Sequence, residues 1–208
     1  MLGHAGGVLV VGLCGGIGAG KSTVARLLEE RGAVIVDVDA IGHRVLDLES
    51  VRDELAGRFG TEMLTSDGAV DRAALSKVVF SNDDSLRALE AISHPLINLE
   101  LAKQLEAIAS ETPDAVVVLD MAVLVETSLG QLANGGGYST VVVVEAGRDL
   151  RIERLGARGI SPEDARARMA RQATDEERRA VADHLLANDS SLAALTDQVD
   201  ALWRELTS

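Results

Sequence analysis

The sequence predicts an α/β fold in which a parallel sheet carries helices on both faces. Three observations support this prediction. Apolar runs rich in valine, which are typical of strands buried on both faces, recur along the chain. Segments with helical spacing separate these runs, as the crossovers of a parallel sheet require. Residues 8–39 hold two such runs around one helical segment, which is a strand–helix–strand unit of about 30 residues.

The expected strands follow from these apolar runs. The four stronger ones are "VLVVGLC" at 8–14, "AVIVDVD" at 33–39, "DAVVVLD" at 114–120 and "STVVVVEA" at 139–146. A short last strand is expected within 181–189. The first helix, "TVARLLEERG", should end at Gly32, because glycine commonly follows the last helical turn. The segment "SLAALTDQVDALWREL" has the apolar spacing of an amphipathic C-terminal helix.

Helical patterns dominate between the second and third strands. Two candidates, "VRDELAGRFG" and "DRAALSKVVF", precede a long helix, "SLRALEAISHPLINLELAKQLEAIAS", in which Pro95 should cause a kink or a break. The last third is arginine-rich and splits at "RGISPED", where Ser161 can cap a helix that Pro162 begins. We interpret 1–208 as one domain. Its parts are a core (8–40, 114–146 and 181–208), a helical insertion (41–110) and an arginine-rich lid (148–180).

Composition narrows the function. Acidic residues outnumber basic ones, and the net charge of −13 disfavours nucleic acid as a partner. Aromatic residues make up only 2% of the chain, which argues against base-stacking platforms. The single cysteine, Cys14, excludes an intrachain disulfide and fits a reducing compartment. No export signal is evident, and no apolar stretch reaches the roughly 20 residues that span a bilayer. We expect a cytoplasmic monomer without a membrane partner.

The segment "GGIGAGKS" carries the strongest motif. From Gly15 to Ser22 it matches G-x-x-x-x-G-K-[S/T], the P-loop pattern, between a buried strand and a helix. Glycines let the backbone curl with its amides inward, and the helix N-terminus adds to this anion-binding nest. Lys21 supplies a full charge for the β- and γ-phosphates, and the Ser22 hydroxyl is placed to bind Mg²⁺. The sequence therefore predicts ATP and Mg²⁺ as ligands. The residues expected at the nucleotide are Gly16, Gly18, Ala19, Gly20, Lys21, Ser22 and Thr23.

Acidic residues close two of the expected strands. Asp37 and Asp39 end the second strand and Asp120 ends the third, at the edge of a parallel sheet where ligands bind. A carboxylate there can accept a proton from an attacking hydroxyl, or hold the metal through water. For Asp37 and Asp39, a strand-end turn with a helix-capping acid is the structural alternative. We expect Asp120 to lie near the acceptor or near the Mg²⁺ ion.

Cationic side chains stabilise the charge of phosphoryl transfer, and the lid contains nine arginines. Acids are interleaved with them, so most should be solvated or paired, while two or three reach the nucleotide. These arginines are Arg148, Arg151, Arg154, Arg158, Arg166, Arg168, Arg171, Arg178 and Arg179.

Taken in order, the motifs resemble those of the dephospho-coenzyme A kinase family along nearly the whole chain. The matching pieces are "GLCGGIGAGKST", "VDVDAIGHRV", "DGAVDRAAL", "LEAISHPLI", "LDMAVLVE", "RIERLGARGIS", "RMARQ" and "ADHLLAND". The sequence departs from the family pattern after Asp120, where Ala122 and Val123 stand in place of a usual proline and leucine.

The resemblance implies that ATP phosphorylates the ribose 3′-hydroxyl of dephospho-coenzyme A, the last step of coenzyme A synthesis. It implies that Asp39 is the base or orients the acceptor, that Arg158 and then Arg154 are the lid arginines at the nucleotide, and that Asn188 lies near the adenine. His43, Arg72 and His94 are then expected on the coenzyme A side, within the helical insertion.

Structural alternatives stay open for these last three residues. His94 also fits a buried kink at Pro95, Arg72 also fits a pair with Asp71 or Glu90, and His43 also fits a helix surface. The nearest rival function is another small-molecule kinase with the same core. A non-catalytic nucleotide sensor is the rival from another class, and it would not need Asp39. A GTPase and an ABC-type ATPase are disfavoured, since neither N-K-x-D nor L-S-G-G-Q occurs.

Overall fold

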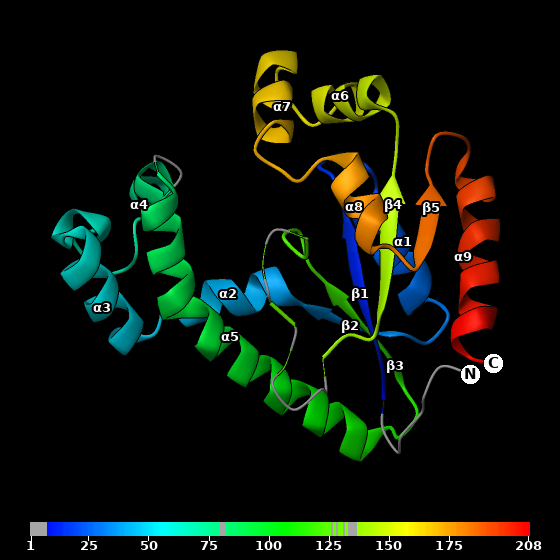
Figure 1. Cartoon of the computed structure of the whole chain (residues 1–208), viewed down its shortest axis with the longest axis horizontal. Coiled ribbons are helices and arrows are strands. Elements are labelled where there is room, and N and C mark those ends of the chain that lie inside the picture. The colour runs from blue at the N-terminus through cyan, green and yellow to red at the C-terminus, as the bar shows by residue number, and fades with distance from the viewer. Residues whose placement is uncertain (1–7, 80–81, 126, 128, 131, 133–136) are drawn as a thin grey trace. The chain divides into compact units, whose positions relative to one another are not determined.

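The computed structural model describes residues 8–79, 82–125, 127, 129, 130, 132 and 137–208 (Figure 1). The glycine-rich segment 130–138, for which the sequence predicts no function, falls largely outside these residues. The described chain divides into two compact units. Unit 1 comprises the chain up to Asp37 and from Gln104 onward, and unit 2 comprises Val38–Lys103. For comparison, the sequence predicts a helical insertion over 41–110.

Within the described residues, unit 1 is built on a five-stranded sheet in the order β2-β3-β1-β4-β5, in which all neighbours are parallel. The strands are β1 (Leu9–Gly15), β2 (Val34–Asp37), β3 (Val116–Asp120), β4 (Thr140–Glu145) and β5 (His184–Ala187). All seven residues of β1 are buried. In β3 and in β4, every residue except the last is buried. This two-sided burial explains the continuous valine runs.

Helices surround this sheet in unit 1. They are α1 (Lys21–Glu29), α6 (Arg148–Gly156), α7 (Pro162–Met169), α8 (Asp175–Val181) and α9 (Leu192–Leu206). α1 and α9 lie side by side, and both contribute to the core around β1, for example through Val24 and Val199. The predicted α/β fold is confirmed.

Local signals fixed several helix ends. Gly32 follows α1 with a φ of 106°, in the left-handed region that glycine tolerates. Ser161 caps α7 as predicted, because its Oγ accepts a hydrogen bond from the backbone of Asp164 at 3.1 Å. Thr174 and Glu177 form a reciprocal capping box at the start of α8.

Unit 2 is helical. It contains α2 (Val38–Leu46), α3 (Glu49–Phe59), a 3₁₀ turn (Thr61–Met63), α4 (Arg72–Val79) and most of α5 (Asp83–Glu111). The sequence predicts a kink or a break at Pro95, and the structure shows no break, because α5 continues through this residue. Ile97, Leu101 and Leu105 are buried at four-residue spacing beyond the proline, and this packing supports the helix where a backbone donor is missing. No helix in the described ranges combines the length and apolarity needed to cross a membrane.

One strand boundary was predicted wrongly. The second strand was expected to run through Asp39, but β2 ends at Asp37 and α2 begins at Val38. Val36 and Val38 are buried while Asp37 and Asp39 are exposed, which reads as strand alternation. Val38, Ile41 and Val45 nevertheless bury a helical face, and that longer pattern decides the conformation. Asp39 therefore lies in the first turn of a helix.

Candidate active site

The loop between β1 and α1 has the conformation that the P-loop pattern predicts. Gly18 and Gly20 have φ values of 80° and 104°, which only glycine adopts at little cost. The amide of Ala19 donates to the carbonyl of Gly16 at 2.9 Å and tightens the turn. Gly20 is the N-cap residue of α1, and the first N–H groups of a helix have no partner inside it. These groups form a site for an anion.

Lys21 and Asp120 form an ion pair at this helix terminus. Strand register brings them together, because Asp120 at the end of β3 pairs with Leu13 on β1 and with Asp37 on β2. Both side chains are about four-fifths buried, with 19% and 20% exposure. The predicted lysine and strand-end acid thus meet at the carboxyl edge of the sheet.

The outer side of the loop is held by Arg154 and Asn188. Arg154 donates to the backbone carbonyl of Asn188 at 2.9 Å and to that of Ala19 at 3.4 Å. The Asn188 amide donates to the same Ala19 carbonyl at 2.8 Å. Asn188 lies so close to Gly20 that a Cβ there would collide with its amide nitrogen. These bonds turn loop carbonyls outward, which leaves the amides to face a ligand.

A cavity of about 380 Å³ opens beside the loop. It is lined by loop and α1 residues, by polar side chains and by apolar side chains of α9, among them Gly18, Gly20, Thr23, Arg154, Arg158, Asn188, Leu192 and Leu195. Arg158, expected to be catalytic, is exposed and lines this cavity. Its contact with a phosphate stays a prediction.

Unit 2 contains the other predicted residues. Asp39 and His43 are exposed and stand four residues apart on α2, so they share one helix face. Arg72 begins α4 and pairs with Asp47 at 3.3 Å. The observed partner is therefore neither Asp71 nor Glu90, the two considered from the sequence. Asp71 instead accepts hydrogen bonds from the amides of Ala73 and Ala74 and caps α4. Substrate contact of these residues stays a prediction.

His94 is half-buried on α5. Burial lowers the pKa of its imidazole below the ordinary value of 6.5, and the opposing effect of Glu90 is smaller. The folded protein therefore keeps His94 neutral at a pH where the unfolded chain protonates it. The stability associated with the neutral form is complete above pH 6.5 and is lost as the pH falls through the folded-state pKa.

The corresponding variant is His94→Gln, which cannot titrate. Between about pH 7.5 and about pH 5.5, a window that brackets the ordinary histidine pKa, we expect the wild-type Tm to fall more than the variant Tm. Thermal unfolding followed by circular dichroism measures this difference. A difference that stays constant or widens in favour of the wild type on acidification would contradict the stated pKa direction.

Sequence reasoning missed two further contacts of the loop. The Ile17 amide donates to the Gln172 side chain at 2.8 Å, and the Arg151 Nε donates to the Ile17 carbonyl at 2.9 Å. Gln172 occurs in the quoted "RMARQ" piece and Arg151 among the nine lid arginines, but no spacing rule links either to a loop more than 130 positions earlier.

Comparison with known proteins decides the family. The family model described as dephospho-CoA kinase matches residues 9–194. The chain belongs to the dephospho-CoA kinase family. Similar dephospho-CoA kinases include that of Streptomyces avermitilis, 43% identical over 96% of this chain and 94% of the relative. That of Thermobifida fusca is 40% identical over 96% of both chains.

Solved structures share the fold of this chain. The crystal structure of TT1252 from Thermus thermophilus superposes with a TM-score of 0.80 at 33% identity, over 97% of this chain and all of that one. A dephospho-CoA kinase from Campylobacter jejuni (TM-score 0.60, 24% identity, 96% of this chain and 97% of that one) shares the fold. So does a shikimate kinase from Bacteroides thetaiotaomicron (TM-score 0.51, 15% identity, 96% and 99%).

Membership of the dephospho-CoA kinase family makes the chain an enzyme, a phosphotransferase that uses ATP. Its reaction phosphorylates the 3′-hydroxyl of dephospho-coenzyme A and is the final step of coenzyme A biosynthesis. The predicted family and reaction are confirmed.

Proposed function

We propose that unit 1 holds ATP, that unit 2 holds dephospho-coenzyme A, and that Asp39 accepts the proton of the attacking hydroxyl. The observation that carries this proposal is the Lys21–Asp120 pair at the N-terminus of α1. A lysine held at a helix N-terminus, above a glycine loop, suits the phosphates of a nucleotide. In this scheme residues 41–110 serve the acceptor, and residues 148–180 act as a lid over the phosphates.

Phosphate binding would exchange the partner of Lys21. A triphosphate carries more negative charge than the Asp120 carboxylate, so the ammonium group can turn from one to the other within the same site. The amides of Gly18, Gly20, Lys21 and Ser22 would face the phosphate oxygens, whereas those of Ile17, Ala19 and Thr23 already donate within the protein. Arg154 and Asn188 would keep the loop carbonyls outward, and the cavity beside Arg158 would take the base and ribose.

The residues present also fit Mg²⁺. Ser22, in the first turn of α1, offers a hydroxyl and Asp120 a carboxylate, and Mg²⁺ prefers oxygen ligands together with substrate phosphates. In the described residues, no group of three or more His, Cys, Asp and Glu side chains could hold a metal by itself. Bound Mg²⁺ would neutralise charge that develops on the β- and γ-phosphates.

The proposed transfer is a nucleophilic displacement at the γ-phosphorus of ATP. The ribose 3′-oxygen bonds to the γ-phosphorus, the bond from that phosphorus to the β–γ bridging oxygen breaks, and ADP leaves. The proton of the 3′-hydroxyl passes to the Asp39 carboxylate. His43, one helical turn from Asp39, would contact the acceptor, as would Arg72 and His94 elsewhere in unit 2.

The role of Ser22 gives a separate prediction. Ser22→Ala removes one oxygen ligand, so ATP binding should need a higher Mg²⁺ concentration, while binding in the absence of Mg²⁺ stays near the wild-type level. Calorimetric titration with ATP across a series of Mg²⁺ concentrations measures both. Thr23→Ser, which keeps a hydroxyl next door, is the matched control. Identical Mg²⁺ dependence in Ser22→Ala and wild type would remove Ser22 from the metal site.

The site of phosphorylation tests the proposed function as a whole. The enzyme is incubated with ATP, Mg²⁺ and dephospho-coenzyme A, and the product is examined by phosphorus NMR and mass spectrometry. We expect one new phosphate monoester on the 3′-oxygen of the ribose and one ADP for each product molecule. A phosphate at another position, or ADP release without a phosphorylated acceptor, would contradict the proposal.

The cellular setting is proposed on narrower grounds. Cys14 is buried within β1 and is the only cysteine of the sequence, so its thiol has no second cysteine in the chain to form a disulfide with. A reducing compartment such as the cytoplasm keeps such a thiol intact, and ATP is available there. We therefore propose a cytoplasmic enzyme, and the monomeric state stays a prediction.

A further inference from the structure

Ile17 belongs to the phosphate-binding loop, and side chains from the lid region form hydrogen bonds with both its amide and its carbonyl. Its amide donates to Oε1 of Gln172 at 2.8 Å, and its carbonyl accepts from Nε of Arg151 at 2.9 Å. The next two carbonyls, of Gly18 and Ala19, face Arg154 at 3.5 Å and 3.4 Å. Arg151 and Arg154 are three residues apart on α6, so one face of this helix holds three successive carbonyls of the loop.

Arg151 fits the loop closely. Its residue exposure is only 5%, which is unusual for an arginine. A Cβ on Gly16 would collide with its guanidinium group, and a Cβ on Gly18 would lie 2.9 Å from its backbone carbonyl. The loop backbone therefore packs directly on this residue. Burial lowers the pKa of Arg151 from its usual value, so the buried cation depends on its partners.

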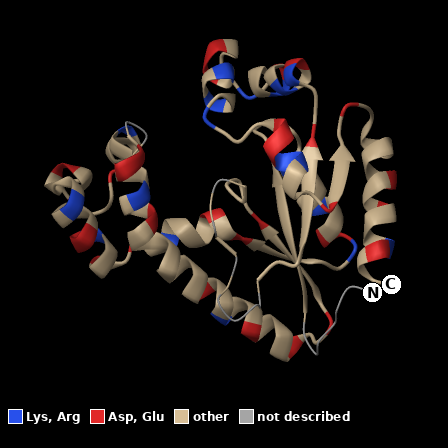
Figure 2. Cartoon of the chain, viewed as in Figure 1, with Lys and Arg blue, Asp and Glu red and all other residues tan. Residues whose placement is uncertain are grey.

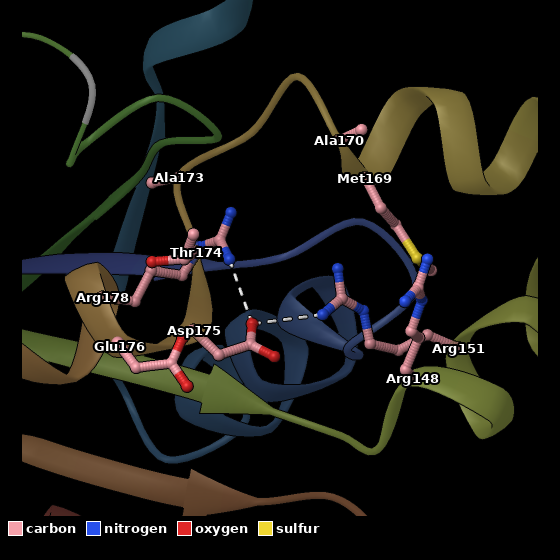
Figure 3. A pocket seen from close by; sticks show the side chains of 9 residues that line it. All are labelled: Arg148, Arg151, Met169, Ala170, Ala173, Thr174, Asp175, Glu176 and Arg178. Atoms are coloured by element: carbon pink, nitrogen blue, oxygen red, sulfur yellow. Dashed lines mark hydrogen bonds and ion pairs between the residues drawn. The ribbon is translucent and has the colours of Figure 1, made fainter.

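Asp175 is the partner that compensates this charge. One carboxylate oxygen of Asp175 accepts from Nη1 of Arg151 and from Nη1 of Arg178, each at 3.2 Å. Figure 3 shows the guanidinium groups of Arg151 and Arg178 approaching this carboxylate from two different directions, while Arg148 extends away from it. These residues line a cavity of about 290 Å³ next to the loop. The fork of Arg151 thus joins the Ile17 carbonyl to the first turn of α8.

We propose that Arg151, oriented by Asp175, is a positioning residue that sets the conformation of the phosphate-binding loop for ATP. The inference rests on the proposed nucleotide role of that loop. Arg151 donates to the Ile17 carbonyl on the outer side, and the Gly18 N–H of the same trans peptide unit then points the opposite way, where a phosphate can meet it. A planar guanidinium can bond the carbonyl and the carboxylate at once, which a lysine ammonium cannot do with the same geometry.

The test compares ATP affinity in folded variants. Arg151→Met keeps most of the side-chain volume and removes both bonds, so the Kd for ATP should rise about 10- to 100-fold, the scale of a lost charge-assisted hydrogen bond. The KM for dephospho-coenzyme A should stay within about twofold of wild type, because this substrate does not use the loop. Arg151→Lys should recover part of the ATP affinity, since it keeps the charge beside Asp175. A purely structural role would lower the Tm without changing the ATP Kd of the folded enzyme.

Arg148→Met is the matched control. Arg148 is exposed, stands three residues earlier on α6 and lines the same cavity, but it makes no hydrogen bond to the loop among the described residues. Its loss should leave ATP binding unchanged. Asp175→Asn combined with Arg151→Met should cost less than the sum of the single changes, because both act through one contact. If Arg151→Met does not fold, Arg151→Lys and Asp175→Asn give the decision.

The outcomes separate this inference from the proposed function. Weak ATP binding in Lys21→Ala together with wild-type binding in folded Arg151→Met, or in Arg151→Lys and Asp175→Asn, would overturn the inference alone. An equal loss in Arg148→Met would also overturn it, by showing an effect of charge in general. Failure of the wild-type enzyme to bind ATP would overturn the proposed function and the inference together.

Discussion

Replacing Lys21 with alanine should nearly abolish the reaction. The change removes the only lysine of the loop. We propose that this positive charge stabilises the γ-phosphoryl group during transfer. Loss of one such electrostatic donor lowers kcat by about 100- to 1,000-fold. ATP affinity should fall as well, because in the proposed complex Lys21 also contacts the phosphates before transfer. Steady-state kinetics with dephospho-coenzyme A and calorimetric titration with ATP measure the two effects.

A second consequence concerns Asp120. Its carboxylate is mostly buried and loses its cation in Lys21→Ala, so the Tm should fall together with the activity. Arg26→Ala is the control, since it removes a cation from the same helix at an exposed i,i+4 pair with Glu30. It should leave both kinetics and ATP binding within about twofold of wild type, as exposed pairs contribute little. Turnover and ATP affinity that survive in folded Lys21→Ala would refute the assignment of the loop to phosphate.

Asp39→Asn should separate binding from chemistry. An asparagine keeps the size of the side chain but cannot accept the hydroxyl proton, so kcat should fall by about two orders of magnitude or more. The Kd for ATP should stay within about twofold, because the proposed phosphate-binding residues all lie in unit 1. Rapid-quench measurement of phosphoryl transfer in a single turnover isolates the chemical step from product release.

The control for this variant is Asp53→Asn. Asp53 is exposed on α3 in the same unit, and its neutralisation changes the net charge equally. Near-normal kcat in Asp53→Asn with a large loss in Asp39→Asn would assign the effect to the site. Unchanged single-turnover rates in Asp39→Asn would exclude it as the base and would favour a nucleotide sensor.

Buried strands and helix caps were predictable because their signals are local. Valine runs locate β1, β3 and β4, and Ser161 with Pro162 locates the start of α7. The end of β2 was not predictable in this way. Two-residue alternation and helical spacing overlap at Val38, and only the packing of Ile41 and Val45 decides between them.

In the candidate site, too, the parts with a local sequence signal were predictable and the parts that depend on long-range packing were not. The segment from Gly15 to Ser22 predicts a phosphate-binding loop because its glycines, lysine and serine occupy the fixed positions of a short motif. The bonds from Arg151 and Gln172 to Ile17 span more than 130 residues. Acidic residues are interleaved with the arginines along α6, α7 and α8 (Figure 2), so in the sequence every lid arginine looks equally able to form an ion pair. Which arginine reaches the loop depends on how α6 packs against it, and a single sequence does not encode that in any local pattern.

Acceptor selectivity tests the central claim most directly, because shikimate kinases share this fold while acting on another substrate. ADP release is measured with ATP and Mg²⁺ and, separately, dephospho-coenzyme A, shikimate, gluconate, AMP or CMP, with Lys21→Ala as the background. We predict release well above that background with dephospho-coenzyme A alone. Release with another acceptor, and none with dephospho-coenzyme A, would contradict the account while leaving the phosphate loop in place.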